Sequence, residues 1–194
     1  MSLLGIDLLR SERLAFMGTI HALTDDEFEN GRTLCSNWAP RDVLALVIGT
    51  GNVRSYLRAG FRINSVNDNT VARMRTLTRE ELTTLGDRWA ERPTLLHLLA
   101  ARFYLGDVCT HHQDVLRGLG RSHELPDFAA AAVFREGVLL STGTERNLLR
   151  YRVEPTTPGV RPIGRGKVVR GSAEALGLWL AGRKGIDKEL HFSN

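Results

Sequence analysis

The sequence predicts a mainly α-helical protein, with a helical bundle over residues 1–143 and a small C-terminal α/β lobe over residues 144–194. Three observations support this prediction. Apolar residues in the first part recur at steps of three, four and seven, which is the spacing of one helix face. Proline, glycine and acidic residues stand between these stretches, where helices begin and end. After Gly143, two short strand-like runs are separated by a segment rich in proline and glycine.

Five stretches of the first part are expected to be helices, and four helices are expected to form the bundle core. The stretches cover residues 3–23, 43–57, 70–88, 93–118 and 127–140. Pro40 and Asp42 favour the start of the second helix, because proline and acidic residues suit a first turn. An asparagine-rich link is expected over residues 64–69, and Pro93 opens the long helix that Gly118 closes.

The C-terminal lobe is expected to contain two strands and one helix. The strands are predicted at residues 149–153 and 165–170, and the helix at residues 173–183. Ser172 precedes that helix and is expected to cap it, because a serine oxygen can accept a hydrogen bond from the first amide groups. The order of strand, strand and helix gives a small lobe that follows the bundle.

Composition and charge argue against several classes of protein. No apolar run approaches the roughly 20 residues that span a bilayer, and the charged N-terminus is unlike a signal peptide, so a cytoplasmic location is expected. The net charge is +4, but the basic residues are spread along the chain, which argues against a nucleic-acid partner. Cys35 and Cys109 lie in different predicted elements, and both are expected to be reduced.

One stretch of the long helix carries the residues that best suit chemistry. His111 follows Asp107 by four positions, and Asp114 follows His111 by three. This spacing places the three side chains on one helix face. A carboxylate and an imidazole at this spacing can hold one divalent ion or share a proton. The same spacing also fits a solvated face with local aspartate–histidine pairs. The neighbouring His112 falls in the opposite, apolar stripe, where we expect a packed histidine with one hydrogen bond.

Three stretches of the sequence resemble the mycothiol-dependent maleylpyruvate isomerase family, whose bundle is similar to the DinB and YfiT fold. Residues 35–44 resemble the cysteine, tryptophan and arginine–aspartate pair at the start of the family's second helix. Residues 106–120 resemble its acid, the histidine four positions later and the aspartate that follows. Residues 169–183 resemble the helix that closes its C-terminal lobe. The resemblance, which spans most of the chain, implies a DinB-like bundle.

The resemblance also implies a metal site and a thiol cofactor. The family's bundle holds a divalent metal, here expected to be zinc, through a histidine of the second helix and an acid and a histidine of a later helix. The corresponding residues here are Asp107 and His111, with Asp114 placed to orient them. The metal would lower the pKa of bound mycothiol or water. Arg183 corresponds to an arginine near the substrate, although a helix-end arginine can also contact the last carbonyl groups.

One position departs from the family pattern. Where the family has the histidine of its second helix, this sequence has Leu46, whose hydrocarbon side chain cannot bind a metal. Two protein ligands would leave a weak site, because catalytic zinc usually has three. His21 and His97 are conceivable replacements, and nothing in the local sequence favours either.

Two hypotheses about function follow from the sequence. The first is a mycothiol-dependent, metal-assisted isomerase or thiol transferase, whose partners are a small thiol and a small electrophile. The second is a non-catalytic descendant of the family, which has lost the complete metal site and binds a small ligand or a protein partner. Leu46 favours the second hypothesis, and the resemblance around His111 favours the first. The sequence leaves the substrate and the oligomeric state open.

Overall fold

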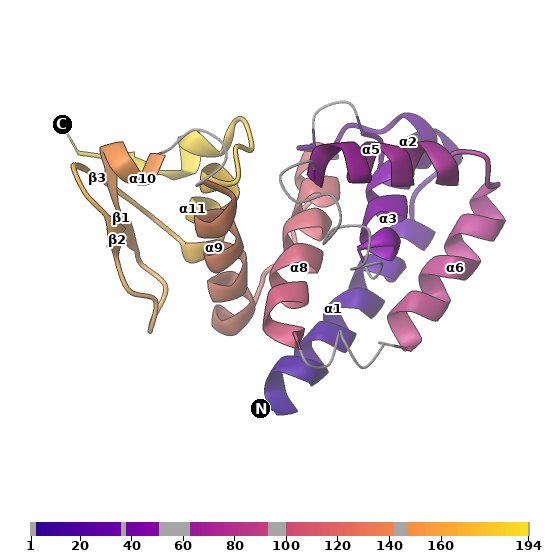
Figure 1. The fold of residues 1–194 in the computed structure, drawn as a ribbon, viewed down its shortest axis with the longest axis horizontal. Helices are drawn as coiled ribbons and strands as arrows, with labels where there is room; N and C mark the ends of the chain where they lie inside the picture. Colours follow the sequence, from indigo (N-terminus) through magenta and orange to yellow (C-terminus); the bar gives the residue numbers. More distant parts are fainter. Residues whose placement is uncertain (1–2, 36–37, 51–62, 93–99, 142–146, 194) are drawn as a thin grey trace. The chain divides into compact units, whose positions relative to one another are not determined.

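The computed structural model describes residues 3–35, 38–50, 63–92, 100–141 and 147–193. Within these residues the chain is mainly α-helical and carries a small four-stranded sheet near its C-terminus (Figure 1). The predicted fold class is therefore confirmed. No helix of this part of the chain is both long enough and apolar enough to cross a membrane.

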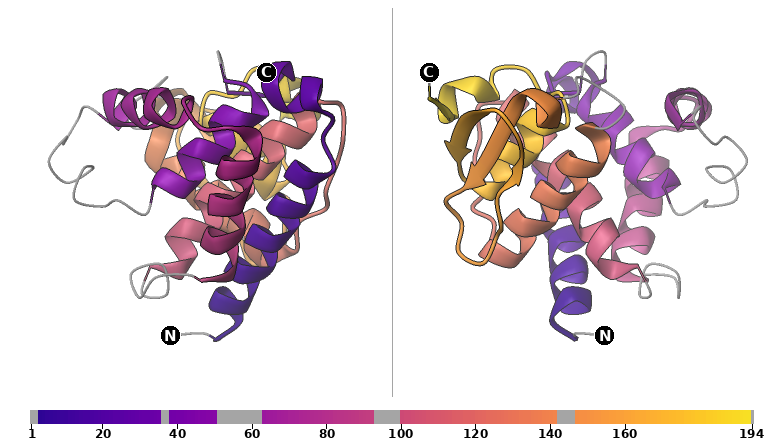
Figure 2. Two further views of the ribbon diagram at one scale, coloured as in Figure 1. Left: turned by 90° about the vertical axis from the view of Figure 1, so that its right-hand side faces the viewer. Right: turned by 60° about the vertical axis from the view of Figure 1, so that its left-hand side comes forward.

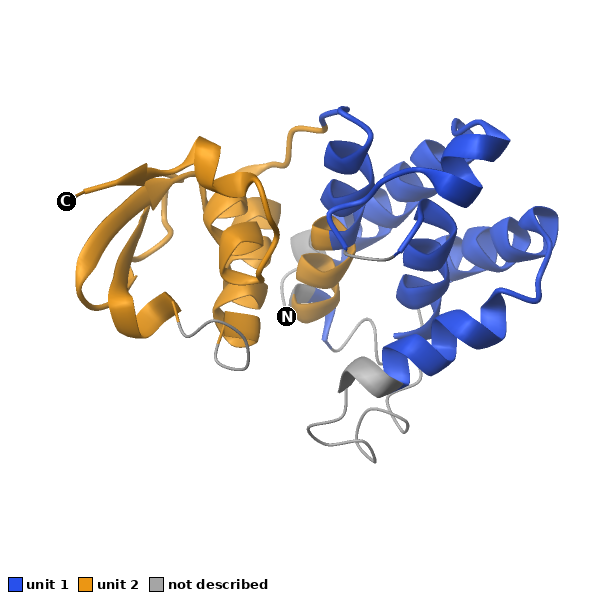
Figure 3. Cartoon of the chain, turned by 90° about the horizontal axis from the view of Figure 1, so that it is seen from above, with its two compact units in different colours: residues 1–101, 111–122 blue, residues 102–110, 123–194 orange. Residues whose placement is uncertain are grey.

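The chain forms two compact units, which Figure 3 shows in different colours. The first contains residues 1–101 and 111–122, and the second contains residues 102–110 and 123–194. The helix α8 (Ala101–Gly118) contributes its beginning to the second unit and its end to the first. The division predicted at residue 143 falls within residues 142–146, which lie outside the described residues, and it stays a prediction.

The first unit is built of helices whose starts are fixed by side chains. Its helices are α1 (Leu3–His21), α2 (Asp25–Asn30), α3 (Pro40–Gly49), α5 (Ile63–Met74), α6 (Arg79–Glu91) and the end of α8. Thr24 caps α2 and Thr78 caps α6 in the same way. Each threonine hydroxyl accepts a hydrogen bond from a glutamate amide, and the side chain of that glutamate, Glu27 or Glu81, accepts one from the threonine amide. These hydrogen bonds lower the pKa of both glutamates and fix where the two helices begin.

Helices α1 and α6 pack together around an aromatic residue. The ring of Phe16 meets the ring of Trp89 edge to face, with 6.4 Å between their centroids. The buried Arg13 lies with its guanidinium carbon 4.4 Å from the centroid of Trp89 and donates a hydrogen bond of 3.0 Å to its carbonyl oxygen. Arg13 therefore makes two interactions with Trp89, a cation–π interaction with its ring and a hydrogen bond with its backbone. This packing fixes α1, whose side chains also reach α8.

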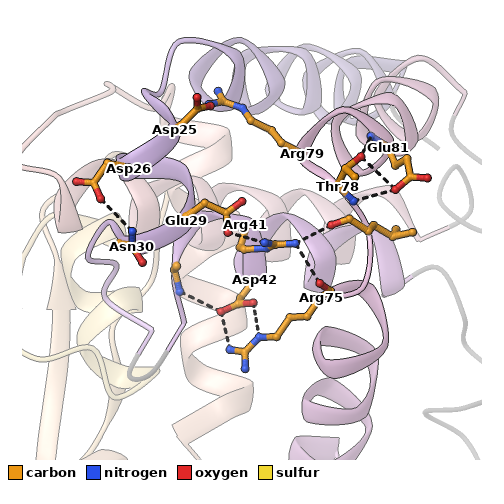
Figure 4. A network of polar contacts seen from close by, with 12 residues as sticks. Asp25, Asp26, Glu29, Asn30, Arg41, Asp42, Arg75, Thr78, Arg79 and Glu81 are labelled. Atoms are coloured by element: carbon orange, nitrogen blue, oxygen red, sulfur yellow. Dashed lines mark hydrogen bonds and ion pairs between the residues drawn. The ribbon is translucent and has the colours of Figure 1, made fainter.

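An arginine network joins the start of α3 to the neighbouring helices (Figure 4). The guanidinium of Arg75 donates to both carboxylate oxygens of Asp42, at 2.9 and 2.8 Å. These hydrogen bonds and the charge of Asp42 raise the pKa of Arg75 above its ordinary value. Arg41 pairs with Glu29 of α2 and donates to the carbonyl oxygen of Leu77 at 2.9 Å. The start of α3 is thereby fixed to α2 and to the turn before α6.

Two sequence predictions for this unit are wrong, and one falls partly outside the described residues. The link predicted at residues 64–69 lies inside α5, where Val71 is 2% exposed and the helix packs against α3. This packing outweighs the low helix propensity of asparagine. The helix predicted over residues 70–88 is instead divided between α5 and α6, because Thr78 caps a new helix. Helix α3 ends at Gly49, and the expected continuation lies at residues 51–57, outside the described part.

The second unit combines helices with a small mixed sheet. Its elements are the beginning of α8, α9 (Asp127–Ser141), α10 (Asn147–Arg150), α11 (Ala173–Leu180), the 3₁₀ helix η1 (Ile186–Glu189), and the strands β1 (Tyr151–Pro155), β2 (Ile163–Gly164), β3 (Lys167–Gly171) and β4 (His191–Phe192). The strand order is β2-β1-β3-β4, and the central strands β1 and β3 are parallel. The predicted helix of residues 127–140 is confirmed as α9.

Helix α11 lies against both α9 and the sheet (Figure 2). Val153 and Val169 are paired across the two central strands and are fully buried. Ser172 caps α11, as predicted, and accepts a hydrogen bond from the amide of Ala175 at 3.1 Å. The strand predicted at residues 149–153 begins later, because Leu149 and its neighbour belong to α10. The predicted order of two strands and a helix is present, with two short strands added.

Candidate functional site

The end of α8 carries a buried polar face. Asp114 is fully buried, with 0% of its surface exposed, and His111 is 7% exposed. Thr110, next to them on the helix, is also buried. The alternative that this stretch forms a solvated helix face is therefore wrong for these side chains. Buried carboxylates and imidazoles need polar partners, and their identity determines what the site can do.

A segment that follows α2 lies directly over this part of α8. The amide of Leu34 donates a hydrogen bond of 3.0 Å to the carbonyl oxygen of Asp114. Gly118 allows the approach, since a Cβ atom there would lie 2.3 Å from the carbonyl oxygen of Arg32. The hydroxyl of Thr33 accepts a hydrogen bond from the amide of Cys35 at 3.2 Å. These contacts place Cys35 beside the buried face of the helix.

Three side chains converge where this segment meets α8. The thiol of Cys35 donates to Oδ2 of Asp114, at a sulfur-to-oxygen distance of 2.9 Å. Nδ1 of His111 lies 3.0 Å from the same oxygen atom and 3.7 Å from the sulfur of Cys35. A sulfur, a nitrogen and an oxygen atom therefore lie close enough together to bind one metal ion.

The structure confirms only part of the predicted grouping. His111 and Asp114 contact each other as the helix spacing suggested, whereas Asp107 is not a member of the cluster with Cys35. Asp107 lies one helical turn before His111, and its role as a ligand stays a prediction. Leu46, which the sequence resemblance sets at the position of the family's histidine, is a buried residue of α3 and offers no donor atom.

The pattern of residues around Cys35 did not predict a role for it in the site. The cysteine lies 76 positions from His111 along the chain, so no helix periodicity could relate the two residues. The available signal was its place three residues before Trp38, in the first of the stretches that resemble the isomerase family. That resemblance indicated that the stretch was unusual, but not which side chain it would contact.

His112 points to a different environment from its neighbour. Its Nδ1 atom lies 2.6 Å from a carboxylate oxygen of Glu12, and its Nε2 atom lies 2.8 Å from the hydroxyl of Thr19. The ring of Phe16 meets the imidazole edge to face, at a centroid distance of 5.5 Å. The predicted packed histidine is confirmed, although it contacts two polar partners where one was expected. Both ring nitrogens are occupied by α1, which favours a structural role.

The other predicted residues lie apart from this cluster or outside the described chain. His21 pairs with Asp87 on the surface, with 2.8 Å between Nε2 and a carboxylate oxygen, and is therefore an unsuitable third ligand. His97 falls within residues 93–99, outside the described part. Arg183 donates a hydrogen bond of 3.1 Å to the carbonyl oxygen of Ala181, just after α11. This contact is the helix-end interaction expected as an alternative, and the catalytic role of Arg183 stays a prediction.

Comparison with known proteins supports the fold. No family model matches the sequence, and no curated protein matches it. The structure is similar to the crystal structure of a histidine-to-alanine mutant of the mycothiol-dependent maleylpyruvate isomerase, with a TM-score of 0.69. The match covers 97% of this chain and 91% of that chain, at 16% sequence identity. The chain thus has the fold of this DinB-like isomerase, and a shared fold does not establish a shared activity.

Proposed function

We propose that this protein is a metal-assisted isomerase or thiol transferase, which uses a low-molecular-weight thiol of the mycothiol type on a small electrophile. The observation that carries the proposal is the buried contact of 3.0 Å between Nδ1 of His111 and Oδ2 of Asp114. Histidines that take part in metal sites are commonly held by a carboxylate, which fixes the ring orientation and the tautomer. The similar fold belongs to a mycothiol-dependent isomerase.

Each residue of the proposed site has a distinct task. A bound divalent metal would lower the pKa of a thiol, which supplies a thiolate nucleophile near neutral pH. His111 contributes to the metal site, and Asp114 holds the imidazole in place. We further propose that Asp107 lies near the metal as an acidic ligand and that Arg183 contacts the electrophile, as the resemblance implies. The proposed partners are small molecules, so DNA binding with a steep salt dependence is not expected.

The competing function is a binding protein without catalysis. Leu46 favours this alternative, because the buried leucine cannot supply the histidine ligand that the isomerase family has at this place. Such a protein would contain no metal after purification without chelator. It would still gain thermal stability from a ligand that binds only the folded state.

Metal analysis separates the two functions. We expect about one zinc per chain in the wild type, as for a single catalytic site. His111→Ala should lose the metal, whereas His21→Ala should keep it, because His21 pairs with Asp87 at the surface. The metal-loaded wild type should then convert maleylpyruvate in the presence of mycothiol, or conjugate mycothiol to a small electrophile, and the metal-free protein should not. Wild-type protein that binds no zinc would contradict the proposal.

A further inference from the structure

We propose that Cys35, His111 and Asp114 are the metal ligands of this protein, and that Cys35 supplies the third ligand that Leu46 cannot. The proposal rests on the proposed function, because it identifies the ligands of the same site. It replaces the ligand set proposed above from the resemblance, in which Asp107 and His111 hold the metal and Asp114 orients the imidazole. In the new ligand set Asp114 itself binds the metal beside His111, and Asp107 is not a ligand.

The distances fit one small cation. Zinc binds sulfur at about 2.3 Å and nitrogen or oxygen at about 2.0–2.2 Å, so ligand atoms of a tetrahedral site lie roughly 3.3–3.6 Å apart. The sulfur of Cys35 and Nδ1 of His111 are 3.7 Å apart. The two distances to Oδ2 of Asp114, 2.9 and 3.0 Å, are hydrogen-bond lengths. They need to open by only about half an ångström when a cation replaces the hydrogen atoms between the ligands.

The charges also favour a cation at this place. A thiolate at Cys35 would lie 2.9 Å from a fully buried carboxylate oxygen, and two like charges so close repel each other strongly. A divalent ion compensates both charges. On binding, the thiol proton leaves to solvent, and neutral His111 carries its proton on Nε2 while Nδ1 binds the metal.

The ligands come from two segments that are already fixed to each other. The amide of Leu34 bonds to the carbonyl oxygen of Asp114, and Gly118 lets the segment approach α8 closely. The amide of Cys35 donates to the hydroxyl of Thr33, which in turn contacts the carbonyl oxygens of Cys35 and Trp38, at 3.0 and 2.7 Å. A metal therefore needs little rearrangement of the backbone to bind. Cys35 is half-buried, whereas His111 and Asp114 are buried.

Cobalt substitution tests whether Cys35 is a ligand. A thiolate bound to Co²⁺ gives a sulfur-to-metal charge-transfer band in the near ultraviolet, and oxygen and nitrogen ligands do not. We expect this band in the Co²⁺-loaded wild type and in Cys109→Ser, and we expect it to be absent in Cys35→Ser. Zinc affinity should fall in Cys35→Ser by more than the roughly 10–100-fold that follows loss of a residue outside the coordination sphere. Co²⁺-loaded wild type without the band would overturn the proposal.

Cys109 is fully buried, so its variant could lose stability, and alkylation of the wild type gives an independent measurement. Zinc should slow the modification of Cys35 by iodoacetamide at least about tenfold, because a bound thiolate is not available as a nucleophile. Peptide mapping assigns the modified cysteine. Equal rates of Cys35 modification with zinc and with chelator would contradict ligation by this residue.

Further variants separate this proposal from the proposed function. Asp107→Asn should keep the cobalt band if the three residues named here hold the metal. If Asp107→Asn loses the metal while Cys35→Ser keeps it, the ligand assignment is wrong and the metal-assisted function remains supported. If the cobalt band is present and depends on Cys35 but no thiol-dependent turnover occurs, the ligand assignment stands and the function is wrong.

Discussion

His111 and His112 are neighbours in sequence and are both buried, with 7% and 1% of their surface exposed. Their partners differ completely. His111 shares one carboxylate oxygen with a thiol, which gives three atoms that can all bind a metal. His112 has both ring nitrogens occupied by Glu12 and Thr19 of α1. Burial alone therefore does not distinguish the two histidines, whereas their partners do: a thiol and a carboxylate lie beside His111, and a carboxylate and a hydroxyl lie beside His112.

The largest effect on stability is expected from a substitution of His112. His112→Ala removes the Nδ1 donor from the buried carboxylate of Glu12 and leaves a cavity beside Phe16. We expect the free energy of unfolding to fall by about 3–5 kcal/mol. Urea unfolding measures the loss, and zinc content per folded chain should not change. Loss of zinc from folded His112→Ala would show that the two histidines are not separate in function.

Removal of the metal should lower stability only through the cluster that contains His111. Chelator should lower the stability of the wild type by about 2.7 kcal/mol relative to protein with free zinc at 100 times the Kd. Thermal unfolding with zinc and with chelator measures this difference. His111→Ala is the matched comparison, and its unfolding temperature should be the same in both conditions. A zinc-dependent shift that persists in His111→Ala would place the metal elsewhere.

A substitution at Gly118, where residues 32 and 33 approach α8, should weaken metal binding near His111 and leave the contacts of His112 unchanged. In Gly118→Ala the new Cβ would lie 2.3 Å from the carbonyl oxygen of Arg32 and 2.4 Å from the Cα atom of Thr33. We expect a loss of about 1–3 kcal/mol in stability, together with weaker zinc binding, because the segment before Cys35 must move. Calorimetry and zinc titration measure the two effects.

Gly18→Ala is the control for this substitution, because the position is inside α1 and, apart from the backbone of α1 itself, no atom of the described residues lies within 4 Å of the added Cβ. This variant should gain up to about 1 kcal/mol in stability through helix propensity. Its zinc affinity should equal that of the wild type. Unchanged zinc binding in Gly118→Ala would mean that the approach of the segment to α8 does not determine the metal site.

The smallest expected effect concerns the second partner of His112. Thr19→Val keeps the side-chain shape and removes the hydroxyl 2.8 Å from Nε2. We expect a loss of about 1 kcal/mol, typical of one hydrogen bond, with unchanged zinc content. Chemical unfolding of the variant beside the wild type checks this value. A loss close to that of His112→Ala would mean that the hydroxyl, and not Glu12, dominates the environment of the ring.

The sequence could predict what depends on neighbouring positions along the chain. The contact of His111 with Asp114 follows from helix spacing, and so does the separation of His112 from them. The fold class followed from periodicity and helix-end residues, and three stretches that resemble one family pointed to a fold that the structure shares. The helical state of residues 64–69 was missed, because packing of α5 against α3 outweighs local propensity.

Contacts between residues far apart in the chain could not be predicted from the sequence. Cys35 reaches Asp114 across 79 positions and Glu12 reaches His112 across 100, and both contacts depend on how whole segments pack. Leu46 shows the same limit of sequence-based prediction in another way. Its side chain showed that one expected ligand was missing, but only the course of residues 31–35 over α8 showed which other residue could replace it.

The amide of Leu34 is a built-in reporter of this packing. Its hydrogen bond to Asp114 joins the backbone of the segment to the same residue whose side chain meets Cys35 and His111. The amide proton can exchange with deuterium only when the segment lifts away from α8. The exchange time of this one proton therefore records how often the cluster comes apart, and it does so in the unmodified protein at any metal concentration.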